Sequence, residues 1–148
     1  LIFYSSILSL IDLAESKMGI NKSVDSEVWG IDIKVHTENK EAIFAHPFSD
    51  KIKIFEESST NIGLVENLRL KSKKFNRILV ILDSDHTANH VLKELELYSP
   101  FVSVGSYCVV FDSTIEDLPE KQFRDRDWGP GNSPRTAANK FLETHSNF

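Results

Sequence analysis

The chain has 148 residues, of which 41% are hydrophobic and 26% charged, a composition typical of one soluble globular domain. The formal net charge of −5 argues against a dedicated nucleic-acid binder, and no apolar run approaches the roughly 18 residues that span a bilayer. The single cysteine, Cys108, excludes an internal disulfide and a cysteine-rich zinc site. It lies in an apolar run, so we expect a buried thiol and a reducing, cytoplasmic setting.

Helical and strand patterns alternate along the chain. Apolar residues at a 3.6-residue period predict a first helix at residues 2–18, which Gly19 ends and which a linker of Asn, Lys, Ser and Asp follows. The later patterns predict four strands, at residues 28–33, 51–55, 77–82 and 106–111. Three helices separate these strands, at residues 38–45, 60–71 and 87–98. A loop over 112–133 leads to a last helix from Pro134 to about Glu143.

This alternation predicts an α/β fold with a mostly parallel sheet. The run at residues 77–82 is nearly all apolar, which is typical of a central strand buried on both faces. Ligands of such sheets bind beyond the carboxyl ends of the strands. Three of the four strands end in an aspartate, namely Asp32, Asp83 and Asp112. We expect these aspartates at one rim of a ligand site, and the alternative is that they only favour the turns that follow strands.

The segment Asp83–His86 is the densest cluster of chemically active groups. Its two carboxylates and one imidazole can hold a hard divalent cation and supply a base, and Asp112 can complete the oxygen shell. His86 and His90 are four residues apart on one helix face, but Thr87 stands where the zinc-protease motif requires glutamate. We therefore expect His90 to pack or to support its neighbours.

Five segments of the chain carry a family resemblance. They are VWGIDI, EAIFAHP and EESST in the first half, then VILDSDHTANHVLKELELYSPFVSVGSYCVVFD and WGPGNSPRTAANKFL in the second. The order LDSDH, GSY, WGPGN is a far more specific signal than a lone glycine motif. With these segments the chain resembles the cephalosporin hydroxylase / rhamnosyl O-methyltransferase family over nearly its whole length. The resemblance implies a Rossmann-like methyltransferase that uses S-adenosylmethionine to methylate a hydroxyl of a sugar, glycolipid or small metabolite.

The resemblance also implies a cofactor site and a substrate loop. The implied cofactor-binding residues are Asp32, Ser58, Ser59 and Asp83. Among them, Asp32 is expected at the ribose hydroxyls, and Ser58 and Ser59 are expected beside the adenine. The implied substrate-side loop consists of Trp128, Gly129, Gly131 and Asn132.

A magnesium site is implied as well, with Asp83 or Asp85 as one ligand and Asp112 as another. The related catechol O-methyltransferases place a basic residue three positions after a metal aspartate. Asp83 and His86 have this spacing, so we expect His86 to be the catalytic base and Asp83 to act with it. Phe111 is a departure, because some family members carry an acid immediately before the position of Asp112. This departure predicts weaker metal binding or none.

Parts of the family's pattern have no counterpart in these 148 residues. They are the glycine-rich cofactor loop, the first central strand before it, and the C-terminal antiparallel strands. We therefore expect a piece of a longer protein with a truncated sheet. Since the loss of a central strand exposes the paired edges of its neighbours, we expect this piece alone to be marginally stable and to bind the cofactor poorly.

Three other functions stay open. A small-metabolite hydroxylase is suggested by the family's name, but the chain lacks a convincing spacing for an iron site of two histidines and one carboxylate. A catalytically silent binding or partner subunit is favoured by Phe111. A Rossmann-like domain for another nucleotide, such as NAD, fits the strand pattern alone. The expected partner is a small-molecule, glycan or glycolipid acceptor, and a homo-oligomer is one alternative for the assembly.

Overall fold

The computed structural model describes residues 1–20 and 25–148, and the linker predicted after Gly19 lies partly outside these described residues. The chain divides into two compact units, Leu1–Asn61 and Ile62–Phe148. Each unit contains helices and one pair of parallel strands, which confirms the mixed α/β class. That the two units form a single domain stays a prediction. No helix in the described ranges is long and apolar enough to cross a membrane.

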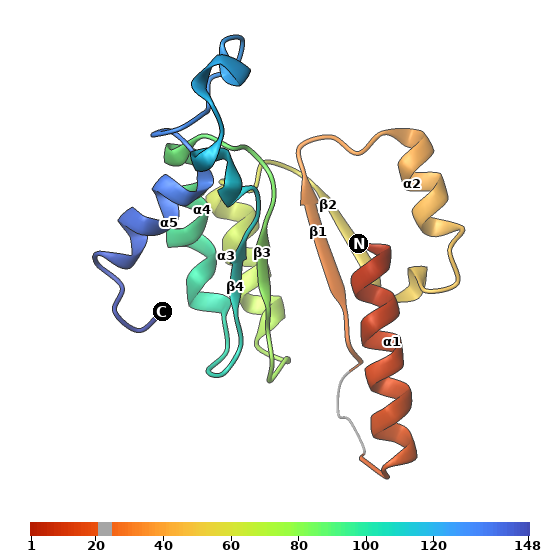
Figure 1. Cartoon of the computed structure of the whole chain (residues 1–148). Coiled ribbons are helices and arrows are strands. Elements are labelled where there is room, and N and C mark those ends of the chain that lie inside the picture. Colours follow the sequence, from red (N-terminus) through yellow and green to blue (C-terminus); the bar gives the residue numbers. More distant parts are fainter. Residues whose placement is uncertain (21–24) are drawn as a thin grey trace. The chain divides into compact units, whose positions relative to one another are not determined.

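The first unit is built on one strand pair and two helices (Figure 1). Its elements are α1 (Ile2–Lys17), β1 (Val28–Asp32), α2 (Thr37–Phe44), the 3₁₀ turn η1 (Ser49–Lys51) and β2 (Ile52–Glu56). The two strands are parallel, and Asp32 at the end of β1 stands opposite Glu56 at the end of β2. A salt bridge of 2.6 Å from Lys51 Nζ to Asp12 Oδ2 ties η1 to α1.

The end of α1 follows the local rule that Gly19 predicted. Gly19 has a left-handed φ of +74°, which glycine adopts without a Cβ clash. Its N–H donates to the Ser16 carbonyl at 3.1 Å, and the Ile20 N–H donates to the Glu15 carbonyl at 2.9 Å. These two bonds form a Schellman motif, which satisfies carbonyls that a helix end otherwise leaves unpaired.

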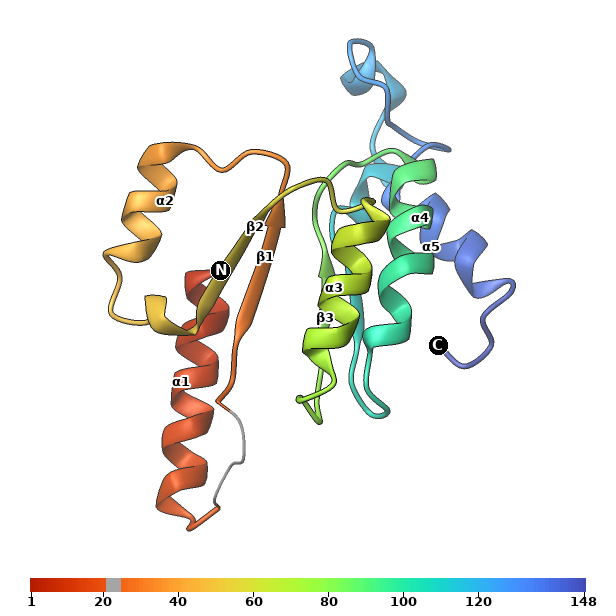
Figure 2. The same ribbon diagram turned by 180° about the vertical axis from the view of Figure 1, so that it is seen from behind.

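The second unit contains the larger set of packed elements (Figure 2). Its helices and strands are α3 (Ile62–Ser72), β3 (Val80–Leu82), α4 (Ala88–Tyr98), β4 (Cys108–Val110) and α5 (Pro134–Leu142). Three 3₁₀ turns join them, η2 (Ser99–Phe101), η3 (Ser113–Asp117) and η4 (Glu120–Phe123). α4 contacts both β3 and α5, and α5 contacts η3 and β4. Ten buried apolar side chains form this unit's core, Val65, Leu68, Val80, Leu82, Val91, Leu95, Tyr98, Ile115, Ala137 and Phe141.

Both strands of the second unit are shorter than predicted. The Ile78 N–H donates to the Ser103 hydroxyl at 2.9 Å instead of to a neighbouring strand, so the β3 ladder begins only at Val80. The ladder pairs Leu82 with Val110 in parallel register. Within the described residues β3 pairs with β4 alone, whereas the apolar run had predicted a strand inside a larger sheet.

The segment between β4 and α5 is more ordered than the predicted loop. It contains η3, η4 and an antiparallel bridge between Gly129 and Asn132. Short 3₁₀ turns have no extended apolar period, so the sequence pattern could not reveal them. The predicted start of α5 is confirmed, because Pro134 is its first residue and the Ser133 hydroxyl accepts from the Thr136 N–H at 3.2 Å.

Candidate functional site

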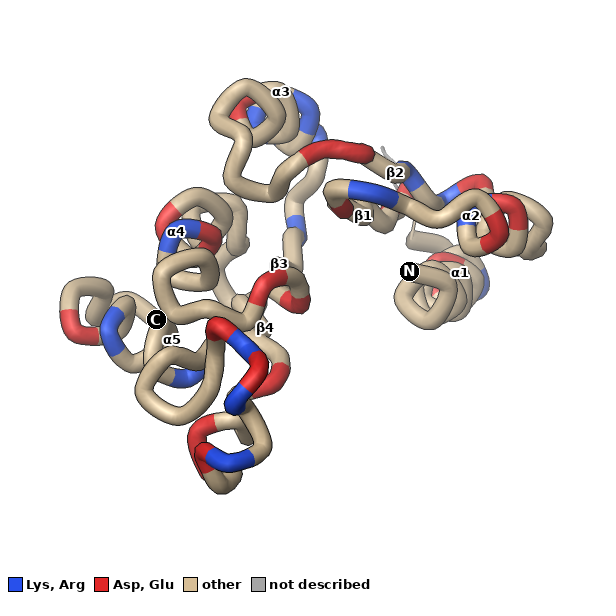
Figure 3. The backbone as a smooth tube through the Cα atoms, turned by 90° about the horizontal axis from the view of Figure 1, so that it is seen from above, with Lys and Arg blue, Asp and Glu red and all other residues tan. Residues whose placement is uncertain are grey.

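Three of the predicted site residues meet at the carboxyl ends of β3 and β4. Asp83 follows β3 directly, and Asp112 lies two residues beyond β4. Because the strands are parallel, both carboxylates reach the same edge of the pair. One ligand atom each from Asp83, His86 and Asp112 lies within 4.8 Å of the others. Figure 3 shows acidic segments close to the labels of β3 and β4. We call these three residues the strand-end cluster.

The imidazole of His86 is held by Asp112. Its Nε2 lies 2.6 Å from Asp112 Oδ2, and the two side chains are 26% and 49% exposed. An ionised carboxylate can only accept, so His86 donates from Nε2, and whenever the ring is neutral Nδ1 keeps a lone pair. Asp112 has a left-handed φ of 54°, and no other described non-glycine residue has a positive φ. The chain therefore bends sharply at Asp112, where its carboxylate meets the ring.

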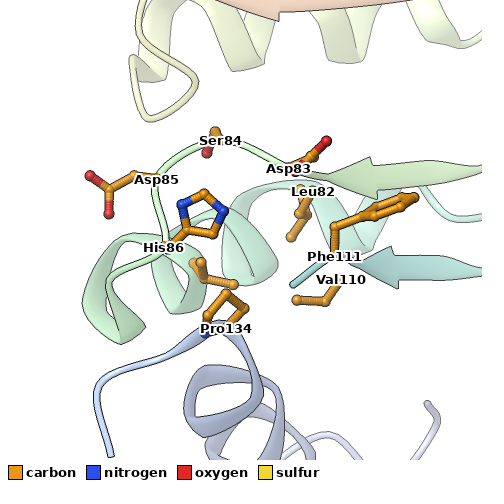
Figure 4. Close-up of a pocket in the computed structure, with 9 residues that line it drawn as sticks. Leu82, Asp83, Ser84, Asp85, His86, Val110, Phe111 and Pro134 are labelled. Atoms are coloured by element: carbon orange, nitrogen blue, oxygen red, sulfur yellow. The ribbon is translucent and has the colours of Figure 1, made fainter. Parts of the chain in front are cut away.

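Asp85 lies apart from the strand-end cluster. Its Oδ1 accepts from the N–H and the hydroxyl of Thr87, at 2.7 and 2.6 Å, at the beginning of α4. In Figure 4 the Asp85 carboxylate points away from Asp83. Partial burial by itself raises the pKa of Asp85, but the two bonds from Thr87 and the charges of His90 and His86 lower it below the ordinary value. The structure therefore brings Asp83 and Asp112 together and holds Asp85 in a tight turn with Thr87.

A shallow hollow lies beside the cluster (Figure 4). One side is the loop Asp83–His86, and the other is apolar, formed by Leu82, Val110, Phe111 and Pro134. Phe111 supplies a ring to the wall of the hollow. As it stands the hollow has no room for a water molecule, so it marks where charged and apolar side chains meet and is not a formed ligand pocket.

Trp128 of the predicted substrate loop lies against His86. The ring centroids of Trp128 and His86 are 4.8 Å apart, and those of Trp128 and Phe123 are 5.3 Å apart. The Arg126 guanidinium stands 4.5 Å from the Trp128 ring centroid. Gly129 is buried, and a Cβ there would come within 3.2 Å of Phe123. The loop therefore carries an aromatic ring next to the imidazole, and a side chain at position 129 would require Phe123 to move by a few tenths of an ångström.

Asn132 connects this loop to the helix that follows His86. Its Oδ1 accepts from the Ala88 N–H of α4 at 2.9 Å, and its Nδ2 donates to the Asp127 carbonyl at 2.5 Å. The backbone groups of Gly129 and Asn132 also bond to each other, at 2.9 and 3.0 Å. Both polar groups of the Asn132 side chain thus bind the protein itself, so Asn132 fixes the loop in place.

Glu116 pins the same loop from η3. Its carboxylate accepts from the Gly131 N–H and the Thr136 hydroxyl, both at 2.9 Å, and from the Ser133 hydroxyl. The Ser133 and Gly131 bonds lower the pKa of Glu116 below its ordinary value. Gly131 has a φ of +82°, a conformation that side chains other than glycine rarely adopt. No sequence pattern pointed to Glu116, because its partners come from a loop and from the first turn of α5.

The residues predicted at the cofactor's ribose and adenine belong to the first unit. Asp32 ends β1, is exposed, and accepts from the Lys34 N–H at 3.0 Å. Ser58 and Ser59 follow β2, and the Ser58 hydroxyl accepts from the Thr60 N–H at 3.3 Å. These residues share the carboxyl edge of the β1–β2 pair. That this edge joins the strand-end cluster in one site stays a prediction.

Glu94 is a buried residue that the sequence interpretation missed. It lies on α4 and is 2% exposed, and its Oε1 accepts from the Ser84 hydroxyl at 2.7 Å. The His90 Nε2 lies 3.4 Å from the same oxygen, so His90 supports a neighbour, as expected. The helical period was the available signal, because position 94 falls on the face that buries Val91 and Leu95.

Comparison with known proteins agrees with the resemblance. The model of the rhamnosyl O-methyltransferase/CmcI family matches residues 1–148. The "Rhamnosyl O-methyltransferase" of Mycobacterium tuberculosis strain H37Rv is 48% identical over 65 residues, 43% of this chain and 26% of the relative. The protein of the same name in Mycobacterium leprae strain TN is 39% identical over 69 residues, 46% of this chain and 30% of the relative. The aligned part thus spans little more than a quarter of these relatives. No solved structure gave a significant match.

Proposed function

This chain belongs to the rhamnosyl O-methyltransferase/CmcI family, and we propose that it acts in methyl transfer from S-adenosylmethionine to a hydroxyl of a sugar, glycolipid or small metabolite. The observation that carries the proposal is the strand-end cluster beside an apolar hollow. It lies at the carboxyl edge of parallel strands, where open α/β sheets bind their ligands. The matched relatives are named for methylation of a rhamnosyl group. Since the chain aligns with about a quarter of their length, the activity of the whole protein is part of this proposal.

His86 is the base in this proposal. S-adenosylmethionine, when bound, supplies a methyl group on a positively charged sulfur, which leaves as a neutral thioether. The His86 ring takes the proton of the acceptor hydroxyl on Nδ1, because Asp112 holds the Nε2 hydrogen. Asp112 also stabilises the imidazolium that forms, since the carboxylate charge lies next to it. The bond that forms joins the acceptor oxygen to the methyl carbon.

Asp83 and Asp112 are the residues that would hold a magnesium ion. Magnesium in proteins binds one or two carboxylates and keeps several waters, and these two carboxylates fit that donor set. A bound divalent ion lowers the pKa of an oxygen that it contacts. We assign the ion to these residues rather than to Asp85, because Thr87 occupies the Asp85 carboxylate. The missing acid at Phe111 predicts weak binding.

Asp32, Ser58, Ser59 and Asp83 are the proposed contacts of the donor. An exposed carboxylate at the end of a parallel strand can accept hydrogen bonds from both ribose hydroxyls. Asp32 has this position in the first unit. Ser58 and Ser59 follow the neighbouring strand and offer hydroxyl and backbone groups to the adenine. Glu56 is already paired with Lys40 at 3.0 Å, which leaves Asp32 as the acid of this edge proposed to bind the ribose.

The loop Trp128–Asn132 is the proposed acceptor side. Trp128 presents an aromatic ring next to the proposed base, and aromatic rings pack well against the carbon faces of small organic molecules. Gly129 and Gly131 let the loop follow its tight path, and Asn132 and Glu116 fix it.

The test is a transfer assay with the full-length protein. S-adenosylmethionine carrying a labelled methyl group is mixed with a rhamnosyl glycolipid, a free sugar or a small alcohol, with magnesium or with a chelator. We expect label in at least one acceptor and a modest stimulation by magnesium. Binding of the donor by calorimetry without transfer to any acceptor would instead indicate a silent subunit. Activity that requires iron and oxoglutarate but no S-adenosylmethionine would indicate a hydroxylase.

A further inference from the structure

Glu94 is a buried carboxylate that the proposed chemistry does not use. It lies in the middle of α4 on the face that also buries Val91, Leu95 and Tyr98. Its Oε2 has no hydrogen-bond partner within the described part of the chain. Burying a carboxylate is unfavourable unless polar partners compensate. An apolar side chain would fill this position without that cost, so the contacts of Oε1 are the feature that distinguishes glutamate here.

The partner of Glu94 belongs to the loop of the strand-end cluster. Ser84 stands between Asp83 and Asp85, as Figure 4 shows, and donates its hydroxyl hydrogen to Glu94 Oε1 at 2.7 Å. Ser84 thereby ties the loop to the buried face of α4.

The other residues of the loop are held from different sides. Asp85 bonds to Thr87 at the start of α4, and His86 bonds to Asp112 beyond β4. Glu94 is the contact to the protein interior, and His90 lies one turn earlier on the same helix, 3.4 Å from Glu94 Oε1. A carboxylate and an imidazole four residues apart on a helix interact favourably when the ring is charged.

We propose that Glu94 is a positioning residue, which anchors Ser84 so that Asp83 and His86 face Asp112. The inference rests on the proposed methyl transfer for its kinetic readout only. The anchor determines the position of the His86 ring. Trp128 fluorescence can report that position, because the two ring centroids are 4.8 Å apart.

The experiment uses variants of the full-length protein in which Trp29→Phe leaves Trp128 as the one tryptophan of these 148 residues, and any tryptophan outside them is also replaced by Phe. Glu94→Leu and Ser84→Ala break the same bond from its two ends. Glu94→Gln keeps an oxygen acceptor for Ser84. Glu96→Gln makes the matched change on the exposed side of α4. Trp128 emission, the melting temperature, kcat and KM are measured for each variant.

We expect Glu94→Leu and Ser84→Ala to shift the Trp128 emission and to lower kcat about 10–100-fold with little change in KM, because both remove the hydrogen bond that holds the loop. Glu94→Gln is expected to keep most of the emission and kcat, and Glu96→Gln to keep both. If Glu94→Leu does not fold, Ser84→Ala gives the answer, since it leaves the buried carboxylate in place.

Two results would overturn the anchor. One is a lower melting temperature with unchanged emission and kcat in Ser84→Ala, which would show a purely structural bond. The other is an equal loss in Glu94→Gln and Glu94→Leu, because the glutamine keeps the acceptor. If the wild-type protein transfers no methyl group, the proposed function fails, but the emission of Ser84→Ala still decides whether Glu94 places the loop.

Discussion

The two units of the chain differ in how well they are packed. Ten apolar side chains are buried in Ile62–Phe148, whereas Ile52 is the one apolar side chain buried among the described residues of Leu1–Asn61. On α1 the side chains of Phe3 and Leu10 are 68% and 66% exposed. Reactive groups must be held in a fixed geometry to act together. The second unit can do so through its core, and this is where the strand-end cluster lies.

The two units also differ at their strand ends. In both units parallel strands bring acidic side chains to one edge, Asp32 with Glu56 in the first and Asp83 with Asp112 in the second. At the second edge an imidazole bonds to one of the acids, and an indole and a small hollow adjoin it. Under the proposed function this is a division of labour, with the ribose and adenine contacts at the first edge and proton transfer at the second.

The largest expected effect comes from His86→Ala, which should lower kcat about 10²–10⁴-fold because it removes the proposed base.

Asp32→Ala should instead raise the KM for S-adenosylmethionine about 10–100-fold and leave kcat nearly unchanged, because it removes a hydrogen bond to a charged group. Steady-state kinetics at saturating and limiting donor separate the two effects. If His86→Ala changes KM and spares kcat, the division of labour is wrong.

The next effect concerns the cores. Phe141→Ala removes a buried ring of the second unit, which should lower the free energy of unfolding by about 3–5 kcal/mol. Leu10→Ala changes an exposed side chain of the first unit and should change the free energy of unfolding by no more than about 0.5 kcal/mol. Denaturant unfolding of the full-length variants measures both. Equal losses would mean that Leu10 is buried in the intact protein.

A smaller effect is expected from the pH dependence of stability. The bonds from Ser133 and Gly131 lower the pKa of Glu116 in the folded state, so this carboxylate stabilises the fold above its ordinary pKa of 4.5. That contribution is lost as the pH falls through the lowered value. At pH 7 the melting temperature of the wild type should therefore be higher than that of Glu116→Gln. The gap between the two melting temperatures should close in acid.

Glu56 in the first unit is the control for this pH effect. Its pKa is also lowered, by Lys40 and the Val35 N–H, but its carboxylate is exposed. Since water and salt screen exposed pairs, Glu56→Gln should produce a smaller gap than Glu116→Gln. Melting curves between pH 7 and pH 3 give both gaps. A gap for Glu56→Gln as large as that for Glu116→Gln would contradict the difference in packing.

The smallest effect is on the thiol of β4. Burial raises the pKa of Cys108 to about 11, so little thiolate exists near neutral pH. At pH 8 a maleimide should label Cys108 slowly in the native protein and fast in the unfolded protein. Equally fast labelling of both states would show that β4 is not packed as described.

Local rules of the sequence predicted the element boundaries that depend on a few neighbouring residues. Gly19 ends α1 through bonds that reach back three and five residues, and Pro134 begins α5. The convergence of Asp83 and Asp112 was also predictable, because parallel strands must place their carboxyl ends at one edge. These features depend on backbone geometry, which short patterns encode.

Contacts between distant side chains were not predictable in this way. Asn132 bonds to Ala88, 44 residues earlier, and Ser84 bonds to Glu94 across the turn into α4. Neither pair shares a periodic pattern, since each depends on how two packed elements meet. The apolar run at residues 77–82 predicted a longer strand than β3 for a similar reason. Apolar side chains indicate burial, but they do not indicate which partner each backbone N–H will find.

The left-handed backbone of Asp112 constrains how this position can be probed. Alanine there would strain the main chain and delete the carboxylate at once, because a Cβ is disfavoured at positive φ unless the side chain is Asn or Asp. Asn keeps the shape and removes the charge, while Gly keeps the bend and removes the side chain altogether. Comparing these two replacements, rather than testing alanine, therefore separates two contributions of Asp112 to the position of the His86 ring. One is its negative charge, and the other is the geometry of the bend.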